Sequence, residues 1–186
     1  KMDGVELDMQ IVGFRGDYFE LKEAARHKVN NLIYPVPDPK YPFLGVHYTP
    51  MIGGEIECGP NAVFTFKREG YKKTSFNMTD TLEALSYKGT LRLFATNWDK
   101  GIEEYRRAFS KKLFVKELQK MMPSITAADV VATRSGVRAQ AVGVQGQMID
   151  DFKIIRNKGV THVINAPSPA ATACMAIADE IIEDLG

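Results

Sequence analysis

The spacing of apolar residues changes near Asp80, and this change decides the fold class. From Met9 to Phe66, apolar residues come in short runs bounded by glycine and proline, which is typical of β-strands. After Asp80 they recur every three or four residues, which indicates helices. Strand-like runs return between Val130 and Asn165, before a last helical segment. This order predicts an α+β fold with a mostly antiparallel or mixed sheet and helices on one side.

The clearest hairpin joins residues 43–49 to residues 55–66 through a turn at Gly53 and Gly54. Pro60 predicts a bulge or a sheet edge in the second arm. The first helix is predicted to begin with a capping box formed by Asp80 and Glu83. One further helix is predicted up to Pro123 from an apolar stripe of Trp98, Ile102, Tyr105, Phe109 and Leu113.

Composition excludes several classes of protein. With 186 residues, 45% of them hydrophobic, the chain can bury one core, or one core plus a fragment of another. The 24 basic and 23 acidic side chains nearly cancel, so we expect no nucleic-acid partner. Cys58 and Cys174 lack metal-ligand spacing and predict ordinary buried thiols, with no metal site. No run approaches the roughly 20 apolar residues of a membrane span, and the start lacks a signal peptide, so a cytoplasmic protein is expected.

Arg134 and Arg138 form the first candidate site. In an extended strand both point to the same side as Gly136 and Gln140. Two guanidinium groups beside a glycine suit a ligand with two carboxylates, because arginine binds carboxylates through paired hydrogen bonds. The alternative is that the arginines are solvated or paired with acids such as Asp150.

His47 is the second candidate, because the alternation of the predicted hairpin places it between the small residues Gly45 and Thr49. A histidine with open space beside it can act as a general base for a substrate hydroxyl. Asn61, in the paired arm, is predicted to support it by binding substrate. A structural role for His47 is the alternative.

The end of the chain reads as a strand, a tight loop of small residues and a helix. The loop and helix start comprise Asn165, Ala166, Pro167, Ser168, Pro169, Ala170, Ala171 and Thr172. A helix start without bulky side chains exposes backbone N–H groups that bind anions. Close packing of a helix on a sheet would explain the same small residues. A Gly-x-Gly-x-x-Gly motif is missing from the sequence, so the main binding element for a nucleotide cofactor is not in this chain.

Eight motifs in register resemble those of the L-2-hydroxyglutarate oxidases and dehydrogenases, FAD enzymes of the D-amino-acid-oxidase-like superfamily. They are FRGDY at 14–18, LIYPVPDP at 32–39, FLGVH at 43–47, GPNAV at 59–63, KREGY at 67–71, GVRAQA at 136–141, IDDF at 149–152 and NAPSPAAT at 165–172. The resemblance covers nearly the whole chain and corresponds to the C-terminal half of those enzymes.

The resemblance implies a substrate-binding domain over residues 1–135 and a return segment over 136–186 whose strand and helix complete an FAD-binding domain. The N-terminal nucleotide-binding part is absent from this chain. By this resemblance, residues 165–172 would line the flavin, and Arg138 would lie where substrate and flavin meet. From the strand pattern and not from the resemblance, Arg138 with Arg134 as helper would hold a small dicarboxylate, and His47 would take the hydroxyl proton while hydride passes to FAD. The fragment is expected to be inactive alone and not to retain FAD. Oxygen or a quinone pool would accept the electrons. The protein would be cytoplasmic, and peripheral contact of the protein with the inner membrane remains an alternative.

Two other functions remain open from the sequence. One is an FAD oxidoreductase of the same superfamily that acts on another small hydroxy or amino acid, because one fold supports several substrates. The other is a non-catalytic binding domain.

Overall fold

A computed structural model describes residues 3–36, 45–168 and 170–183. The strands of the main sheet are β1 (Met9–Leu21), β2 (His47–Pro50), β3 (Ile56–Gly59), β4 (Val63–Phe64), β5 (Val130–Gly143) and β6 (Met148–Ile149), and β7 (Lys153–Asn157) and β8 (Val160–Asn165) form a separate hairpin. The helices are α1 (Glu23–Arg26), α2 (Met78–Ser86), α3 (Lys88–Thr96), α4 (Trp98–Phe109), α5 (Lys111–Leu118) and α6 (Cys174–Glu183). The α+β fold and the antiparallel sheet are confirmed.

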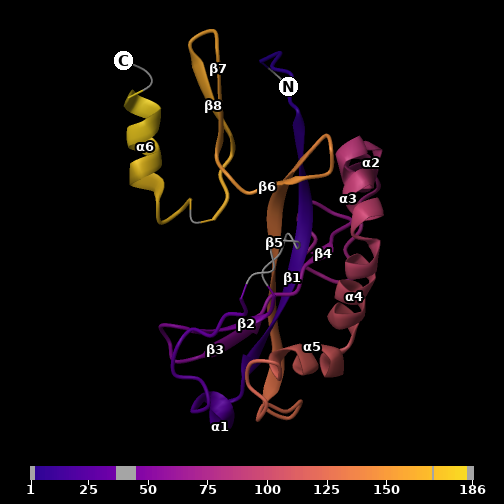
Figure 1. Cartoon of the computed structure of the whole chain (residues 1–186), viewed down its shortest axis with the longest axis vertical. Coiled ribbons are helices and arrows are strands. Elements are labelled where there is room, and N and C mark those ends of the chain that lie inside the picture. Colours follow the sequence, from indigo (N-terminus) through magenta and orange to yellow (C-terminus); the bar gives the residue numbers. More distant parts are fainter. Residues whose placement is uncertain (1–2, 37–44, 169, 184–186) are drawn as a thin grey trace.

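The long antiparallel pair of β1 and β5 is the centre of the molecule (Figure 1). The sheet order is β2-β3-β1-β5-β6, with β4 also paired to β1. Gly16 and Gly136 lie directly opposite each other in this pair, and Phe14 lies opposite Arg138. The register shifts between Asp17 and Phe19, where β5 has an extra residue. This irregularity is a β-bulge, which strengthens the local twist.

Two apolar clusters fill the two ends of the sheet. One packs β1, β2 and β5 against α1 and α5, and the Tyr48 hydroxyl there donates to the Leu118 carbonyl at 3.1 Å. The other packs Val12 and Phe14 of β1 against α3 through Leu93. Figure 1 shows α2, α3 and α4 stacked along one side of the β1–β5 pair, as expected from the sequence.

The predicted helix boundaries were wrong at two places. The helix expected from Asp80 onward is α2, which begins at Met78. The side chain of Asn77 accepts from the backbone N–H of Asp80, so Asn77 and not Asp80 is the N-cap. The apolar stripe expected in one helix is divided between α4 and α5. Ser110 separates them, since it leaves the helical conformation and its hydroxyl accepts from the Leu113 N–H.

The β7–β8 hairpin and α6 project from the main sheet on the side away from α2 and α3 (Figure 1). None of the described residues of α6 is buried. Cys174, the first residue of α6, is therefore exposed, contrary to the expectation of a buried thiol, whereas Cys58 is buried as expected. Burial raises the pKa of the Cys58 thiol to about 12, so it stays protonated at neutral pH.

The predicted division between residues 135 and 136 falls inside β5, which is one continuous strand. The two-domain assignment stays a prediction. In the part of the chain that the structure describes, no helix is long and apolar enough to cross a membrane.

Candidate functional site

His47 begins β2 and is half-buried on the side of the strand opposite to Tyr48. Its Nδ1 lies 3.1 Å from the Gly45 carbonyl oxygen, which can only accept a hydrogen bond. Nδ1 therefore carries the hydrogen, and Nε2 is the basic atom. The Tyr34 ring stacks on the imidazole with centroids 4.1 Å apart. Burial lowers the pKa of His47, so the ring is neutral near pH 7.

Glu57 lies on the same face of the sheet as His47 and forms an ion pair with Arg134. Glu57 pairs with Thr49 in the β2–β3 hairpin, two residues along from the His47–Gly59 pair, and so shares the face of His47. Its Oε1 accepts from the Nε of Arg134 at 2.7 Å. This ion pair raises the pKa of Arg134, which stays fully charged. Arg134 is thus paired with an acid, which was the alternative to carboxylate binding, but the acid comes from β3 and is not Asp150. Substrate binding by Arg134 stays a prediction.

Tyr18 belongs to the same group of residues, which the sequence did not indicate. If residue 59 carried a Cβ atom, that atom would lie 3.2 Å from the Tyr18 ring. The missing side chain of Gly59 therefore allows Tyr18 to approach the β3 backbone. Burial, followed by the charge of Glu57, raises the pKa of Tyr18. We call Tyr18, Tyr34, His47, Glu57 and Arg134 the His47 group.

Arg138 lies further along β5, beside a second set of polar groups. Its guanidinium is 3.5 Å from Oδ1 of Asp150, and its side chain is about half exposed. The buried Gln140 donates to the same Oδ1 at 3.2 Å and to the Ile149 carbonyl at 3.3 Å. At Gly136 an added Cβ would meet nothing within 4 Å. The side of β5 next to Arg138 is therefore open, as the sequence predicted.

Asn165 ends β8 and is buried. Its side-chain amide donates to the carbonyls of Ile149 and Asp151 at 3.2 and 2.8 Å. The Ile149 carbonyl thus accepts from both Gln140 and Asn165. We call Arg138, Gln140, Asn165 and the segment 149–151 the Arg138 group.

The small residues after Asn165 do not start a helix where the sequence predicted. Ala170 donates to the Pro167 carbonyl at 2.9 Å in a turn, and α6 begins only at Cys174. The two prolines disfavour the helical conformation at Ala166 and Ser168, and residues 170–173 form turns before the helix. Ala166, Ser168, Ala171 and Thr172 are exposed and Pro167 is half-buried, while Pro169 lies outside the described residues. This segment offers small side chains and accessible backbone.

Asn61 belongs to neither group and has a structural partner. Its Oδ1 accepts from the backbone N–H of Asp17 at 2.6 Å, and its Nδ2 is 3.4 Å from Oδ2 of Asp17. Asp17 in turn accepts from Nε of the buried Arg15 at 3.0 Å, and Arg15 donates to the Lys72 carbonyl at 3.1 Å. The amide of Asn61 is therefore engaged in the sheet, and substrate binding by Asn61 stays a prediction.

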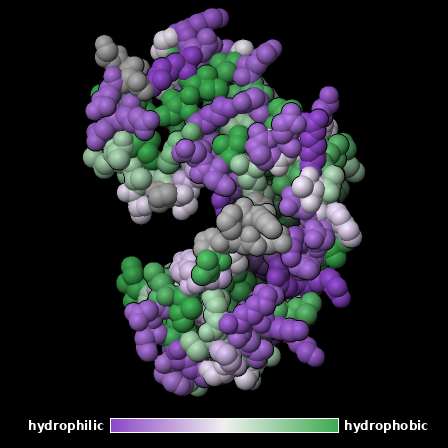
Figure 2. Space-filling view, viewed as in Figure 1, coloured by the Kyte–Doolittle hydropathy of each residue, from purple (hydrophilic) through white to green (hydrophobic). Residues whose placement is uncertain are grey.

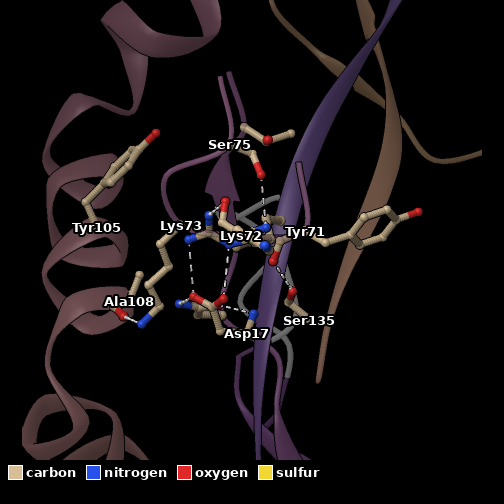
Figure 3. Close-up of polar contacts among 12 residues, drawn as sticks. Asp17, Tyr71, Lys72, Lys73, Ser75, Tyr105, Ala108 and Ser135 are labelled. Carbon is tan, nitrogen blue, oxygen red and sulfur yellow. Dashed lines mark hydrogen bonds and ion pairs between the residues drawn. The ribbon is translucent and has the colours of Figure 1, made fainter. Parts of the chain in front are cut away.

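Figure 3 shows how the loop around Lys72 is held between β1, β5 and α4. The hydroxyl of Ser135 on β5 donates to the Tyr71 carbonyl, and Lys73 reaches the Ala108 carbonyl on α4. The Tyr71 side chain points toward β5, whereas Lys73 points toward α4. This loop connects the sheet to the helices and carries none of the predicted site residues.

The structure thus places Arg134 with His47 and Arg138 with Asn165, while Asn61 belongs to neither group. Arg134 and Arg138 both lie on β5, four positions apart, with Gly136 between them. Figure 2 shows the molecule hollowed between the end that carries β7, β8 and α6 and the end that carries β2 and β3. The residues predicted to bind carboxylate lie on β5, the residue predicted to accept a proton lies on β2, and the small residues follow β8.

Known proteins resemble the chain over nearly its whole length. A family model described as FAD dependent oxidoreductase (DAO) matches residues 1–183. The chain belongs to this FAD-dependent oxidoreductase family. The family expectation from the sequence motifs is confirmed.

Three relatives of this FAD-dependent oxidoreductase chain are named L-2-hydroxyglutarate dehydrogenase. The protein from Indibacter alkaliphilus is 46% identical over 95% of this chain and 44% of its own length. The mitochondrial protein from Nematostella vectensis is 48% identical over 94% of this chain and 40% of its own length. The protein from Escherichia coli K12 is 44% identical over 98% of this chain and 43% of its own length. The chain spans less than half the length of these relatives.

The residues present fit one wall of an FAD site. Asn165 is fixed by two hydrogen bonds, and the exposed residues after it are small, so a planar ring could approach the backbone. The Gly-rich motif that binds the pyrophosphate of a dinucleotide is not in the sequence. The fit is therefore to the flavin end of the cofactor.

Proposed function

We propose that the protein to which this chain belongs oxidises L-2-hydroxyglutarate to 2-oxoglutarate. The observation that carries the proposal is the position of Arg138, half-exposed beside the open Gly136 and linked through the segment 149–151 to Asn165. A carboxylate bound at Arg138 would lie next to the segment that fits a flavin. The names of the relatives support the same substrate.

Arg138 would bind one carboxylate of the substrate. A guanidinium forms two parallel hydrogen bonds with a carboxylate, which fixes the orientation of the substrate as well as its position. The contact with Asp150 is long at 3.5 Å and exposed, so a substrate carboxylate can compete for the same donors. Arg134, held by Glu57, would attract the second carboxylate by its charge.

His47 would accept the proton of the substrate hydroxyl at Nε2. The hydrogen bond from Nδ1 to the Gly45 carbonyl fixes this tautomer, and burial keeps the ring neutral and ready to take a proton. Bound FAD would accept the hydride from C2 of the substrate. Residues 165–172 would hold the flavin, with Asn165 and the accessible backbone after it supplying hydrogen-bond partners.

The test is steady-state kinetics of the longer protein with a dye as electron acceptor. We expect activity with L-2-hydroxyglutarate and none with the D-enantiomer, glycerol 3-phosphate or amino acids. R138K should raise the KM for L-2-hydroxyglutarate at least about tenfold, because lysine cannot form the paired hydrogen bonds, with FAD content unchanged. R106K, on the exposed side of α4, is the matched control. Unchanged KM in R138K, or faster turnover of another substrate, would refute the proposal.

Three further points belong to this proposal. The isolated chain is expected not to retain stoichiometric FAD, and flavin absorbance in the purified chain would contradict this. Electrons would leave for oxygen or for a quinone, which oxygen consumption and reduction of decylubiquinone distinguish. The protein would be found in the cytoplasm or at the inner membrane surface, which cell fractionation measures.

A further inference from the structure

Residues 3–8 lie just before β1 and contact the β7–β8 hairpin, which the proposed function uses only at Asn165. They form neither a helix nor a strand. Figure 1 shows the indigo segment before β1 and the hairpin extending from the same end of the main sheet. An isolated two-stranded hairpin is at best marginally stable in water, so its contacts with other elements decide where it stays. We call residues 3–8 the leading segment.

Asp3 makes the contact near the turn of the hairpin. Its Oδ2 lies 2.8 Å from Nε2 of His162 and accepts from Nδ2 of Asn157 at 3.0 Å. The hydrogen bond with His162, followed by the one with Asn157, lowers the pKa of Asp3, so the carboxylate is ionised at neutral pH. An ionised carboxylate can only accept a hydrogen bond, and Nε2 of His162 is therefore the donor. Both donors reach a single oxygen of Asp3.

Asp8 makes the second contact, at the other end of β7. Its carboxylate pairs with Lys153, the first residue of β7. The Asp8 carbonyl accepts from the Tyr87 hydroxyl at 3.2 Å and from the Val144 backbone N–H at 3.3 Å. Tyr87 lies between α2 and α3, and Val144 directly follows β5. The leading segment thus joins the hairpin to the main sheet and its helices.

The three hairpin residues that hold the leading segment share one face. Lys153 and Asn157 lie four positions apart on β7, and side chains alternate along a strand. His162 pairs with Ile155, which lies midway between them, so His162 points to the same side. The leading segment therefore follows one face of the hairpin along the length of β7.

These contacts hold β8 at two points. At its end, Asn165 donates to carbonyls in the segment 149–151. In its middle, His162 donates to Asp3. One point of attachment would let the strand pivot, whereas two points define its direction. The direction of β8 decides where the small residues after it lie.

We propose that Asp3 and His162 are positioning residues, which fix the direction of β8 and so set the flavin segment 165–172 against a substrate bound at Arg138. The inference rests on the proposed function, because it takes the flavin and the substrate at those places. Hydride transfer needs the reacting atoms close together and aligned. Loss of the bond between Asp3 and His162 should therefore slow the chemical step and leave the carboxylate contact of Arg138 intact.

Amide hydrogen exchange of the longer protein, followed by mass spectrometry, tests the contact without turnover. In D3A, the peptide that covers β8 should exchange at least about threefold faster. D3N should stay within about twofold of the unaltered protein, because the amide oxygen of asparagine still accepts from both His162 and Asn157. D99A removes a carboxylate at an exposed position of α4 and is the matched control.

Steady-state kinetics of the same protein, with FAD saturating, tests the positioning role. H162A should lower kcat for L-2-hydroxyglutarate at least about threefold, while KM changes less than about twofold. D3A should act in the same way. The double variant D3A/H162A should be no slower than D3A, because both substitutions remove one shared contact. H27A, at an exposed position, is the matched control for the histidine.

Each result decides the proposal. Unchanged exchange of β8 in D3A, multiplied effects in D3A/H162A, or a raised KM with unchanged kcat would overturn it. If circular dichroism shows that H162A does not fold, D3A and D3N carry the same kinetic test, since residue 3 precedes the first strand. Exchange does not depend on substrate. Faster exchange in D3A together with no oxidation of L-2-hydroxyglutarate would support the contact and refute the proposed substrate.

Discussion

Arg134 on β5 and Glu57 on β3 are joined across β1, with the Nε of Arg134 2.7 Å from Oε1 of Glu57. Arg134 is mostly exposed, whereas Glu57 is largely shielded. The shielded carboxylate thus holds the exposed Arg134 side chain over the sheet. In the proposed site, Glu57 would act on substrate through Arg134, as a positioning residue.

E57Q should therefore weaken substrate binding more than it weakens the fold. Loss of the charge frees Arg134, and we expect KM for L-2-hydroxyglutarate to rise about three- to tenfold in the longer protein. The free energy of unfolding should change by less than about 1 kcal/mol, because ion pairs with an exposed partner contribute little. E83Q removes one partner of the exposed Arg68–Glu83 pair and is the control for a remote charge change. A lower kcat with unchanged KM would contradict the positioning role.

The half-buried His47 should make stability depend on pH in a defined direction. Burial lowers its pKa in the folded state below the ordinary value of 6.5. As the pH falls, the unfolded chain takes up the proton first, so stability is full above about pH 6.5 and declines from there down to the folded pKa. In H47Q the loss of stability between pH 7.5 and 5.5, measured by urea unfolding, should be smaller. H27Q changes an exposed histidine and should behave like the unaltered chain. If H47Q shows the same pH dependence as the unaltered chain, the lowered pKa of His47 is wrong.

Alanine substitutions at Gly16 and Gly136, which lie opposite each other on β1 and β5, distinguish a packing role from a ligand-contact role. A Cβ at Gly136 meets nothing within 4 Å, so G136A should change the free energy of unfolding by less than about 0.5 kcal/mol. A Cβ at Gly16 would lie 2.5 Å from the Cβ of Pro60, so G16A should clearly destabilise the fold. If substrate approaches the β5 backbone, G136A also raises KM, and full activity of a stable G136A would place the substrate elsewhere.

Asn61 is expected to matter for stability. N61A leaves the N–H of Asp17 without its acceptor in a buried region, which should cost about 1–3 kcal/mol in urea unfolding. N31A, at an exposed position, is the control. A stable N61A with an increased KM would instead support the predicted role of Asn61 in substrate binding.

Local patterns predicted the parts of the fold that depend on neighbouring residues. Alternation in the hairpin placed His47 and Thr49 on one side of β2, and the open space at Gly136 followed from its missing side chain. The Glu57–Arg134 pair could not be predicted, because it depends on the strand order β3-β1-β5 and on a bulge in β5. The break between α4 and α5 at Ser110 was missed because the apolar stripe continues across it.

Contacts between residues far apart in the sequence also determine the hydrogen bonds of Asn61 and the choice of Asn77 as the helix N-cap. Asn61 is bound to Asp17, 44 positions earlier, so its side chain was occupied in a way that no local motif indicates. Two residues that favour helix starts, Asn77 and Asp80, lie three positions apart. Asn77 became the cap, since the carboxylate of Asp80 accepts from the backbone N–H of Arg68.

The segment 149–151 has a consequence for the interpretation of variants. Its backbone accepts hydrogen bonds from Gln140, beside the proposed carboxylate site, and from Asn165, beside the proposed flavin site. A substitution in these three residues would shift both neighbours together. A single lesion there should therefore resemble a double mutant, with substrate affinity and flavin affinity lost in parallel, and its kinetics alone would not assign it to either ligand.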